Sequence, residues 1–421
     1  MKFVKENIEA VKANVKNRFM DVDVDEAVKA YEKKNELITK VELLRKERND
    51  NALKMKGKLE ASERETLVME GRKLKEDIAQ IENELANTEE RLKALSSKIP
   101  NMAHPSAPIG KEDKSNLEIK RVGKIPTFNF TPKDHLTLGE ELDLIDFDSA
   151  AKVSGQKFYY LKNQAVFLEL ALTRYALDIL YKKGFTPMIT PDIAKEEIIE
   201  GIGFNPRGQE SNIYTIEETN TCLVGTAEIT LGGYLSNKIL KASELPIKMA
   251  GLSHCFRKEA GAAGQYSKGL YRVHQFSKVE MFIFCTPSES DKYHQFLLET
   301  EEEIFSGLNI PYRVVDTCTG DLGAPAYRKF DLEAWMPGRG DNGDWGEITS
   351  TSNCTDYQSR RLNIRYKDED GKNHYLHMLN GTAIAISRAI IAIMENFQQA
   401  DGSILIPDNL VPYCGFKAIS K

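Results

Sequence analysis

The sequence predicts an α+β protein in which an antiparallel two-helix coiled-coil arm precedes an antiparallel β-sheet flanked by helices. Apolar residues recur at heptad spacing within the first hundred residues, and short β-rich runs with Gly-rich turns follow residue 131. Little helix separates those runs, which favours antiparallel pairing. The chain has 421 residues, of which 41% are hydrophobic and 29% charged, so two or three domains are expected. This composition excludes a collagen, a small disulfide scaffold and a largely disordered chain.

The coiled-coil arm is expected over about residues 29–98. Between Lys29 and Pro100 there are 17 Lys or Arg and 15 Asp or Glu residues, and the apolar seam is most regular in the second half. Residues 57–62 are the expected reversal, where Ser62 and Glu65 match a capping box. Each helix should contain roughly 30–35 residues and span about 50 Å. A purely structural, solvated coiled coil is the alternative, because the basic excess is small.

The chain is expected to divide into an N-terminal domain (1–100), a linker (101–127) and a larger C-terminal domain (128–421). The linker is rich in proline, which fixes φ and lacks an N–H donor. Helical periodicity in the C-terminal domain predicts helices over 161–183, 288–308 and 382–397. The β-rich runs predict strands at 221–224, 247–249, 279–284 and 311–315.

Charge and cysteine content indicate the class of protein and its compartment. The net charge of −6 excludes a global basic field, although a local nucleic-acid surface remains open. The six cysteines are widely spaced and form no CxxC pair, so we expect reduced thiols. No run of 18 apolar residues and no signal peptide is present, so we expect a cytoplasmic protein that does not bind membranes.

Several common catalytic motifs are absent from the sequence. It contains no GxxxxGK[ST], no GxGxxG after a strand, no HExxH and no GxSxG, and its seven histidines are not clustered at metal-ligand spacing. P-loop, dinucleotide, zincin and esterase sites are therefore poor interpretations. An Arg-Gly-Asp tripeptide at 339–341 is expected to form part of a Gly-rich loop before the strand that carries Glu347.

One expected hairpin has a pattern suited to nucleotide binding. Arg257 and Glu259 would alternate along one strand face, and a second β-like run would return with Arg272, Phe276 and Glu280. Such a hairpin can present an arginine to a phosphate and a carboxylate to the amino group of a nucleobase. A ladder of surface ion pairs on a hairpin is the plain alternative.

This hairpin resembles motif 2 of the class II aminoacyl-tRNA synthetases. Residues 381–388, which end in Arg388, resemble motif 3 and are expected to open an apolar helix. Residues 183–191 resemble motif 1, whose Pro191 lies at the dimer interface in that class. Three motifs in this order imply a class II synthetase sheet in the C-terminal domain, which would then be the catalytic domain.

Further segments are similar to those of the seryl-tRNA synthetases of the bacterial type. They are 225–228, 347–361 and 379–382, together with the long N-terminal hairpin, so the resemblance covers about residues 1–415. It implies a homodimeric ligase that uses ATP and Mg²⁺ to activate L-serine as seryl-adenylate. The seryl group would pass to the 3′-hydroxyl of serine tRNA, and selenocysteine tRNA stays open as a second acceptor.

The resemblance also implies a role for each matching position. Arg257 and Arg388 would be the catalytic residues, and Glu347 and Ser350 would hold the metal ion. The implied ATP-binding residues are Arg257, Glu259, Val273, Phe276, Glu347, Ile348, Thr349, Ser350 and Arg388. The implied serine-binding residues are Thr226, Ala227, Glu228, Arg257, Glu280, Asn380 and Thr382.

Two positions depart from the bacterial pattern. Thr382 stands where serine is common, which adds a methyl group and stiffens χ1. The motif 2 loop, residues 264–269, lacks the arginines that bacterial relatives usually carry there. Two alternatives therefore stay open: a relative that makes seryl-adenylate but loads something other than tRNA, and a non-enzymatic coiled-coil scaffold.

Overall fold

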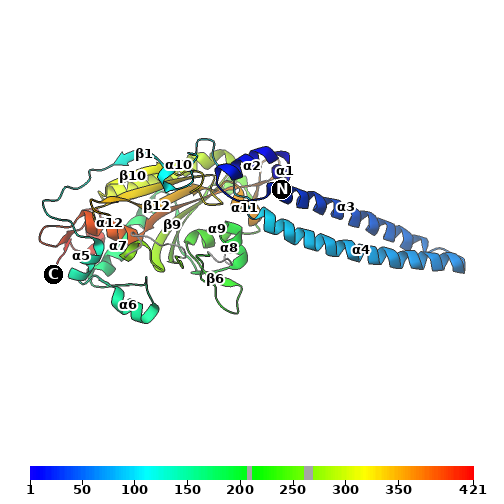
Figure 1. Ribbon diagram of the computed structural model, residues 1–421, viewed down its shortest axis with the longest axis horizontal. Helices are drawn as coiled ribbons and strands as arrows, with labels where there is room; N and C mark the ends of the chain where they lie inside the picture. Colours follow the sequence, from blue (N-terminus) through cyan, green and yellow to red (C-terminus); the bar gives the residue numbers. More distant parts are fainter. Residues whose placement is uncertain (206–210, 260–268) are drawn as a thin grey trace. The chain divides into compact units, whose positions relative to one another are not determined.

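The computed structural model describes residues 1–205, 211–259 and 269–421. These residues form two compact units, Met1–Met102 and Ala103–Lys421. Figure 1 shows the two long helices of the first unit and the sheet of the second. Among the described residues, no helix combines the length and apolar character needed to cross a membrane.

The first unit is helical throughout and contains the arm. The helices α3 (Val24–Lys54) and α4 (Ala61–Ser96) run antiparallel to each other (Figure 1). Leu37, Val41 and Ile78 are buried along the seam between them. Two short helices precede the arm, and ion pairs join its helices. The short helices are α1 (Lys2–Glu6) and α2 (Ile8–Asn17), and the ion pairs include Lys34–Glu89 at 3.0 Å and Arg45–Glu82 at 2.8 Å.

The start of each arm helix differs from its prediction. The first helix begins earlier, at Val24, because the Asp23 side chain caps it by accepting a hydrogen bond from the Glu26 N–H at 2.8 Å. The second helix begins at Ala61, so Ser62 lies inside the first turn and the predicted capping box does not form. A Ser-x-x-Glu pattern indicates a helix start only where the backbone turns at the serine.

The second unit is built on an eight-stranded sheet in the order β1-β10-β11-β12-β15-β9-β8-β4. All neighbours pair antiparallel except β4 and β8, which are parallel. The predicted antiparallel sheet flanked by helices is confirmed. The strands are β1 (Leu117–Val122), β4 (Thr186–Ile189), β8 (Ile247–Phe256), β9 (Gln275–Cys285), β10 (Tyr312–Asp316), β11 (Arg328–Met336), β12 (Asp344–Asn353) and β15 (His377–Ala385).

The alternation of side chains along β9 separates the core from a polar face. Val279, Met281 and Ile283 point into the larger hydrophobic core, whereas Lys278 and Glu280 line a pocket on the other face. Three helices complete the larger core. They are α7 (Gln164–Lys182), α10 (Ser290–Gly307) and α12 (Ile386–Asn396).

Smaller elements surround the sheet and shape the ends of the pocket. The remaining helices are α5 (His135–Glu141), α6 (Phe147–Ser154), α8 (Glu196–Ile202), α9 (Ala227–Gly233), α11 (Tyr357–Arg361) and α13 (Val411–Cys414), with 3₁₀ turns η1 (Asp113–Ser115), η2 (Ala242–Glu244), η4 (Gly269–Tyr271) and η5 (Pro287–Glu289). The minor strands are β2 (Ile145–Asp146), β3 (Tyr160–Leu161), β5 (Ile193–Lys195), β6 (Thr221–Leu223), β7 (Ile239–Lys241), β13 (Arg365–Lys367), β14 (Asn373–Tyr375), β16 (Ile404–Leu405) and β17 (Ala418–Ile419).

Two sequence predictions for the second unit are corrected by the structure. The segment predicted as a linker (101–127) contains β1, an edge strand whose side chains are nearly all exposed. An edge strand without a buried face has no apolar alternation that a sequence could reveal. The helix predicted over 382–397 begins only at Ile386, because residues 377–385 form β15. Both pieces are buried and apolar, and periodicity does not separate a buried strand from a buried helix.

Candidate active site

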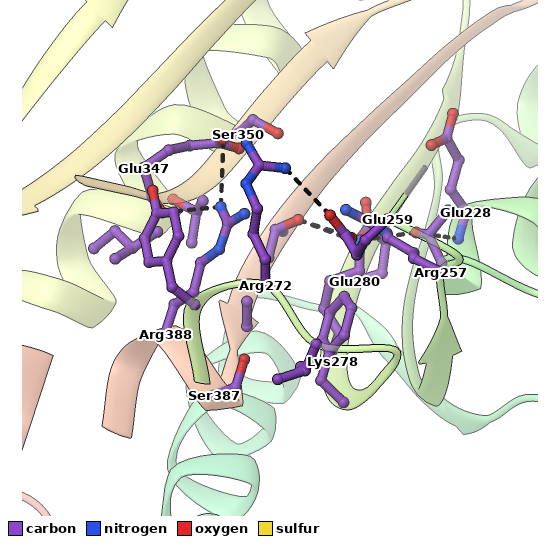
Figure 2. Close-up of a pocket in the computed structure, with 18 of the residues that line it drawn as sticks. Glu228, Arg257, Glu259, Arg272, Lys278, Glu280, Glu347, Ser350, Ser387 and Arg388 are labelled. Carbon is purple, nitrogen blue, oxygen red and sulfur yellow. Dashed lines mark hydrogen bonds and ion pairs between the residues drawn. The ribbon is translucent and has the colours of Figure 1, made fainter. Parts of the chain in front are cut away.

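A polar pocket opens on the face of the sheet opposite the larger core (Figure 2). The residues predicted from the sequence come together there, except Ala227 and Asn380, which are not on its wall. The lining residues are Phe204, Thr226, Glu228, Arg257, Glu259, Tyr271, Arg272, Val273, Phe276, Lys278, Glu280, Glu347, Ile348, Thr349, Ser350, Thr382, Ala385, Ser387 and Arg388.

A buried ion pair lies at one end of the pocket. Lys278 and Glu280 are two residues apart on β9, so they share a face, and they form an ion pair with almost no solvent exposure. Lys278 Nζ also donates hydrogen bonds to Thr226 Oγ1 at 2.8 Å and to Thr382 Oγ1 at 3.4 Å. Thr382 lies opposite Glu280 on β15 and donates to its Oε2 at 3.3 Å. The lysine ammonium group therefore has three oxygen partners, one for each of its N–H donors, and its charge is paired with that of Glu280.

The orientation of the Thr226 hydroxyl follows from these contacts. Thr226 is the N-cap of α9, and its Oγ1 accepts a hydrogen bond from the Glu228 N–H at 3.2 Å. The same oxygen accepts from Lys278 Nζ. Because Oγ1 already accepts two hydrogen bonds, its own proton is available to donate elsewhere, and Thr226 lines the pocket.

Glu228 is held beside this ion pair by two amides. Gln358 Nε2 and Asn380 Nδ2 both donate to Glu228 Oε1, at 2.8 and 3.0 Å. Asn380, which was predicted to bind serine, therefore acts on the pocket through Glu228. Ala227, the other predicted residue that is not on the wall, is buried in the first turn of α9. Burial, with the nearby Glu280 charge, raises the pKa of Glu228 to about 7. A cationic group brought into the pocket would favour its ionised form.

Arginine and tyrosine side chains form the other end of the pocket. Arg388, near the start of α12, donates to the Glu347 carbonyl at 2.9 Å and pairs with its carboxylate at 3.3 Å. Tyr271 also donates to the Glu347 carbonyl, at 3.2 Å, and the Arg388 guanidinium lies 4.6 Å from the centre of its ring. Partial removal of the Glu347 carboxyl from water disfavours its charge, but the charges of Arg388, Lys329 and Arg257 outweigh this effect and lower its pKa. This end is suited to a polyanion beside a metal ion.

A β-bulge places Glu347 and Ser350 on the same face of β12. Ser350 pairs with Asp331 and Glu347 pairs with Glu333, although Glu347 and Ser350 are three positions apart and Asp331 and Glu333 are only two positions apart. Since Asp331 and Glu333 share a face of β11, so do Ser350 and Glu347. Thr349 points to the other face, where its hydroxyl donates to Glu301 at 3.1 Å. Without the extra residue, Glu347 and Ser350 would lie on opposite sides of the sheet.

These two oxygen donors fit a hard cation that obtains most of its other ligands from phosphates and water. Mg²⁺ prefers oxygen and is commonly bound by one or two carboxylates together with phosphates and waters. The described ranges contain no group of three or more His, Cys, Asp or Glu residues placed to hold a metal by themselves. Glu347 and Ser350 are therefore suited to a cation that arrives with a phosphate ligand.

The hairpin that resembles motif 2 differs in detail from its prediction. Strand β8 ends at Phe256, so Arg257 and Glu259 follow the strand, and Glu259 has a positive φ of 48°. The Arg257 guanidinium lies 5.2 Å from the centre of the Phe276 ring, and its Nε donates to the Gly225 carbonyl at 3.2 Å. Glu259 is paired with Arg272 at 3.3 Å. The predicted departure at residues 264–268 lies outside the described residues.

Sequence reasoning missed several side chains of the pocket. Lys278 could have been found, because a lysine two residues before Glu280 on a strand must share its face. Tyr271, Phe204 and Ser387 carry no such signal, since they reach the pocket from a 3₁₀ turn, the end of α8 and the start of α12. Ala385 was missed as well, whereas Val273 and Ile348, which complete the wall, were predicted.

The shifted pKa of Glu228 predicts a pH-dependent stability. Its folded-state pKa of about 7 exceeds the ordinary value of 4.5, so the unfolded chain loses this proton first as the pH rises. Glu228 therefore lowers the free energy of unfolding between about pH 4.5 and 7. We compare the free energy of unfolding of Glu228→Gln with that of the unmodified chain at each pH. We expect this difference to shift by about 2–4 kcal/mol in favour of Glu228→Gln between pH 5 and pH 8.

Urea unfolding of both proteins across pH 5–8 would measure this difference. Glu65→Gln, at an exposed position of α4, is the control and should leave the pH profile unchanged. Parallel profiles for Glu228→Gln and the unmodified chain would contradict the assignment.

Comparison with known proteins agrees along the whole chain. Residues 1–103 match the seryl-tRNA synthetase N-terminal domain, and residues 214–397 match the tRNA synthetase class II core domain (G, H, P, S and T). The serine–tRNA ligase of Treponema denticola is 68% identical over 418 residues, 99% of each chain. That of Borrelia recurrentis is 58% identical over 420 residues, which are 100% of this chain and 99% of the relative.

Solved structures give the same result. The seryl-tRNA synthetase from Pyrococcus horikoshii complexed with ATP has a TM-score of 0.89 and 41% identity, over 99% of this chain and 98% of that one. The cytoplasmic serine–tRNA ligase from Naegleria fowleri in complex with AMP has a TM-score of 0.85 and 31% identity, over 100% and 97%. The resemblance drawn from the sequence motifs is confirmed: the chain belongs to the seryl-tRNA synthetase family.

Proposed function

We propose that this chain is an ATP-dependent ligase that activates L-serine as seryl-adenylate and transfers the seryl group to serine tRNA. The observation that carries the proposal is the pocket itself. At one end it holds buried carboxylates and hydroxyls, and at the other it holds arginines beside a carboxylate. An amino acid and a nucleoside triphosphate need these two environments side by side.

The carboxylate end would bind serine. Glu228 would accept from the serine ammonium group, which favours the charged form of a carboxyl whose pKa is otherwise raised. Glu280 and the hydroxyls of Thr226 and Thr382 would satisfy the serine hydroxyl. A buried polar group left unpaired costs about 1–3 kcal/mol, so alanine leaves this site unsatisfied. A site built to bond a hydroxyl can reject the analogue that lacks it by about 10⁴–10⁵.

The arginine end would bind ATP in a bent form. Arg257 would contact the α-phosphate and the serine carboxylate, while Arg388 would contact the γ-phosphate. Glu259 would accept from the adenine amino group, Phe276 would stack on the ring, and Val273 would offer its backbone. Arg257 already lies over Phe276 and Glu259 already pairs with Arg272, so ATP would displace or join existing contacts.

The remaining nucleotide contacts would come from β12. Glu347 and Ser350 would hold Mg²⁺ against the phosphates, and the backbone at Ile348 and Thr349 forms the wall between them. When bound, the ion supplies positive charge that stabilises the phosphate oxygens. Arg388 neutralises charge at the same end without the ion.

The first reaction needs no nucleophile from the protein. A serine carboxylate oxygen attacks the α-phosphorus, a new P–O bond forms, and the bond to the β-phosphate oxygen breaks to release pyrophosphate. Arg257 at the α-phosphate would align the two reactants and stabilise the charge that develops. The 3′-hydroxyl of the tRNA then attacks the seryl carbonyl, and AMP leaves.

The coiled-coil arm would bind the tRNA. Its helices α3 and α4 expose alternating basic and acidic side chains, many of them in cross-helix ion pairs such as Lys33–Glu84 at 3.1 Å. Such a surface suits contacts with phosphates and RNA shape more than with base edges. The relatives that match the arm and the core together are named as serine–tRNA ligases, which supports tRNA as the acceptor.

A homodimer is supported by an exposed apolar surface. Phe167, Leu170 and Tyr181 follow a helical repeat along α7 and are 56%, 61% and 69% exposed. Ile189, at the end of the edge strand β4, is 85% exposed. Ile189 lies in the segment that resembles motif 1, and α7 leads directly into that segment. Such a face is more consistent with a subunit interface than with a solvated surface. All six cysteines are buried, which is compatible with a cytoplasmic enzyme.

Serine-dependent exchange between ATP and pyrophosphate tests the proposed reaction. We expect exchange with serine, at least about 10³-fold less with alanine, and loss of about 10²–10³-fold in Arg257→Ala because the α-phosphate loses its cation. Arg361→Ala, which removes an arginine outside the pocket, is the control. Absence of exchange with every amino acid would contradict the proposal and favour a scaffold.

The proposed dimer predicts the effect of one substitution on α7. Leu170→Glu places a charge in the apolar face, and we expect the mass in solution to fall from twice the chain mass to 47.5 kDa. Light scattering after size-exclusion chromatography measures this mass. Leu53→Glu changes a residue of equal exposure on α3 (62%) and should leave the dimer intact. An unmodified chain of monomeric mass would rule the dimer out.

A further inference from the structure

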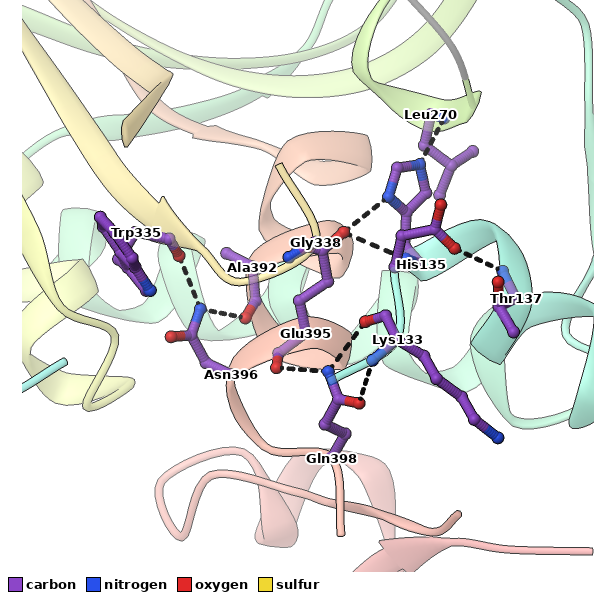
Figure 3. Close-up of polar contacts among 11 residues, drawn as sticks. Lys133, His135, Thr137, Leu270, Trp335, Gly338, Ala392, Glu395, Asn396 and Gln398 are labelled. Carbon is purple, nitrogen blue, oxygen red and sulfur yellow. Dashed lines mark hydrogen bonds and ion pairs between the residues drawn. The ribbon is translucent and has the colours of Figure 1, made fainter. Parts of the chain in front are cut away.

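A buried carboxylate outside the pocket joins three parts of the second unit. Glu395 lies near the end of α12 and is only 2% exposed. Its Oε1 accepts hydrogen bonds from the His135 backbone N–H at 3.0 Å and from His135 Nδ1 at 2.8 Å, and its Oε2 accepts from the Gly338 N–H at 2.8 Å (Figure 3). Glu395 therefore links α12 to the start of α5 and to the turn between β11 and β12.

His135 extends this link to η4, which lies in the connection between the two strands of the motif 2 hairpin. The Leu270 N–H donates to His135 Nε2 at 3.3 Å. A backbone N–H can only donate, so Nε2 must accept, and the proton of the neutral ring lies on Nδ1 and points to Glu395. Gly269 permits the approach, because a Cβ at that position would lie 2.1 Å from His135 Nε2.

One tethered segment carries Tyr271, and two others carry an arginine that lies against its ring. Leu270 directly precedes Tyr271, and Gly338 directly precedes Arg339, whose guanidinium lies 4.7 Å from the centre of that ring. Arg388 lies 4.6 Å from the same centre. Arg388 is seven residues before Glu395 on α12, so both point from the same side of the helix. Tyr271 lines the main pocket and also an adjacent cavity lined by His135, Arg339 and Glu395.

We propose that Glu395 and His135 are positioning residues for the phosphate end of the ATP pocket. They hold Tyr271 and Arg339 in place around Arg388. The Arg388 guanidinium and the Glu347 carbonyl are therefore already fixed relative to each other when ATP binds. This inference rests on the proposed binding of ATP and adds a role for residues that do not touch it. Pre-organised charges of this kind need no rearrangement when the phosphates arrive.

Two substitutions break the link in different ways. Glu395→Gln keeps the shape of the side chain but turns an NH₂ group toward one of its N–H donors, so one tether is lost. His135→Leu removes both ring nitrogens. His135→Gln can still donate to Glu395 and accept from Leu270, and it should rescue the effect. Gln398→Ala is the control, since Gln398 ties α12 to Lys133 but not to Leu270 or Gly338.

Calorimetric titration with ATP, and separately with a non-hydrolysable sulfamoyl analogue of seryl-adenylate, tests the proposal in the full chain. The analogue lacks the β- and γ-phosphates. We expect Glu395→Gln and His135→Leu to weaken ATP binding about tenfold, as when supporting residues of ligating side chains are removed, with less than a twofold change for the analogue. His135→Gln and Gln398→Ala should stay within about threefold of the unmodified chain for both ligands.

Equal weakening of both ligands would indicate a general loss of structure and overturn the positioning role, as would unchanged ATP binding in Glu395→Gln. A His135→Gln protein as weak as His135→Leu would overturn the hydrogen-bond basis of the proposal. If the unmodified chain bound the analogue but not ATP, the positioning role would fail alone. If it bound neither ligand, the proposed function would fail with it.

Discussion

The ion pair between Lys278 and Glu280 is the constraint on which the pocket depends. Both side chains lie on the same face of β9, near the middle of an eight-stranded sheet, and almost none of their surface is exposed to solvent. A buried charge without a partner is strongly destabilising, so the two must pair and fill their other hydrogen-bonding positions from neighbours. Thr226 and Thr382 supply those positions. Their hydroxyls are thereby oriented before any ligand is present.

Two further carboxyl groups line the pocket, each held by backbone as well as by side chains. Glu228 is fixed by two amides and by the cap of α9, and Glu347 is fixed by Arg388 and by a bulge in β12. In a site arranged in this way, the polar groups that stabilise charge in the transition state are already in place before the reaction. The packed helices on the other face of the sheet make this rigidity possible, because they anchor every second residue of the same strands.

The sequence was most informative where chemistry and local pattern coincide. The heptads of the arm and the segments that resemble known motifs predicted the arm, the antiparallel sheet and most of the pocket wall, because each of these signals lies in one continuous segment of the sequence. Local signals failed at boundaries: Ser62 matched a capping box, but Glu60 is the N-cap, and Thr382 lies in a strand that continues directly into α12. Glu347 and Ser350 share a face only because β12 contains one extra residue, which pattern alone does not reveal.

Contacts between distant segments could not be predicted from one sequence. His135, Leu270, Gly338 and Glu395 lie up to 260 residues apart, and each is unremarkable in its own segment. Tyr271 enters the pocket only because the end of the hairpin is folded back over Glu347. Such features depend on how the strands and helices pack, so they follow from the fold and not from any motif.

The central claim is that the Lys278–Glu280 pair shapes the end of the pocket where serine is proposed to bind. The most direct measurement is the KM for serine in pyrophosphate exchange, with the free energy of unfolding, for Lys278→Met. We predict an increase in KM of about 100-fold or more and a loss of about 3–5 kcal/mol, because Glu280 is left buried without its partner. Lys120→Met, which breaks an ion pair with Glu302 outside the pocket, should leave the KM for serine within about threefold. A Lys278→Met protein with an unchanged KM for serine would contradict the account.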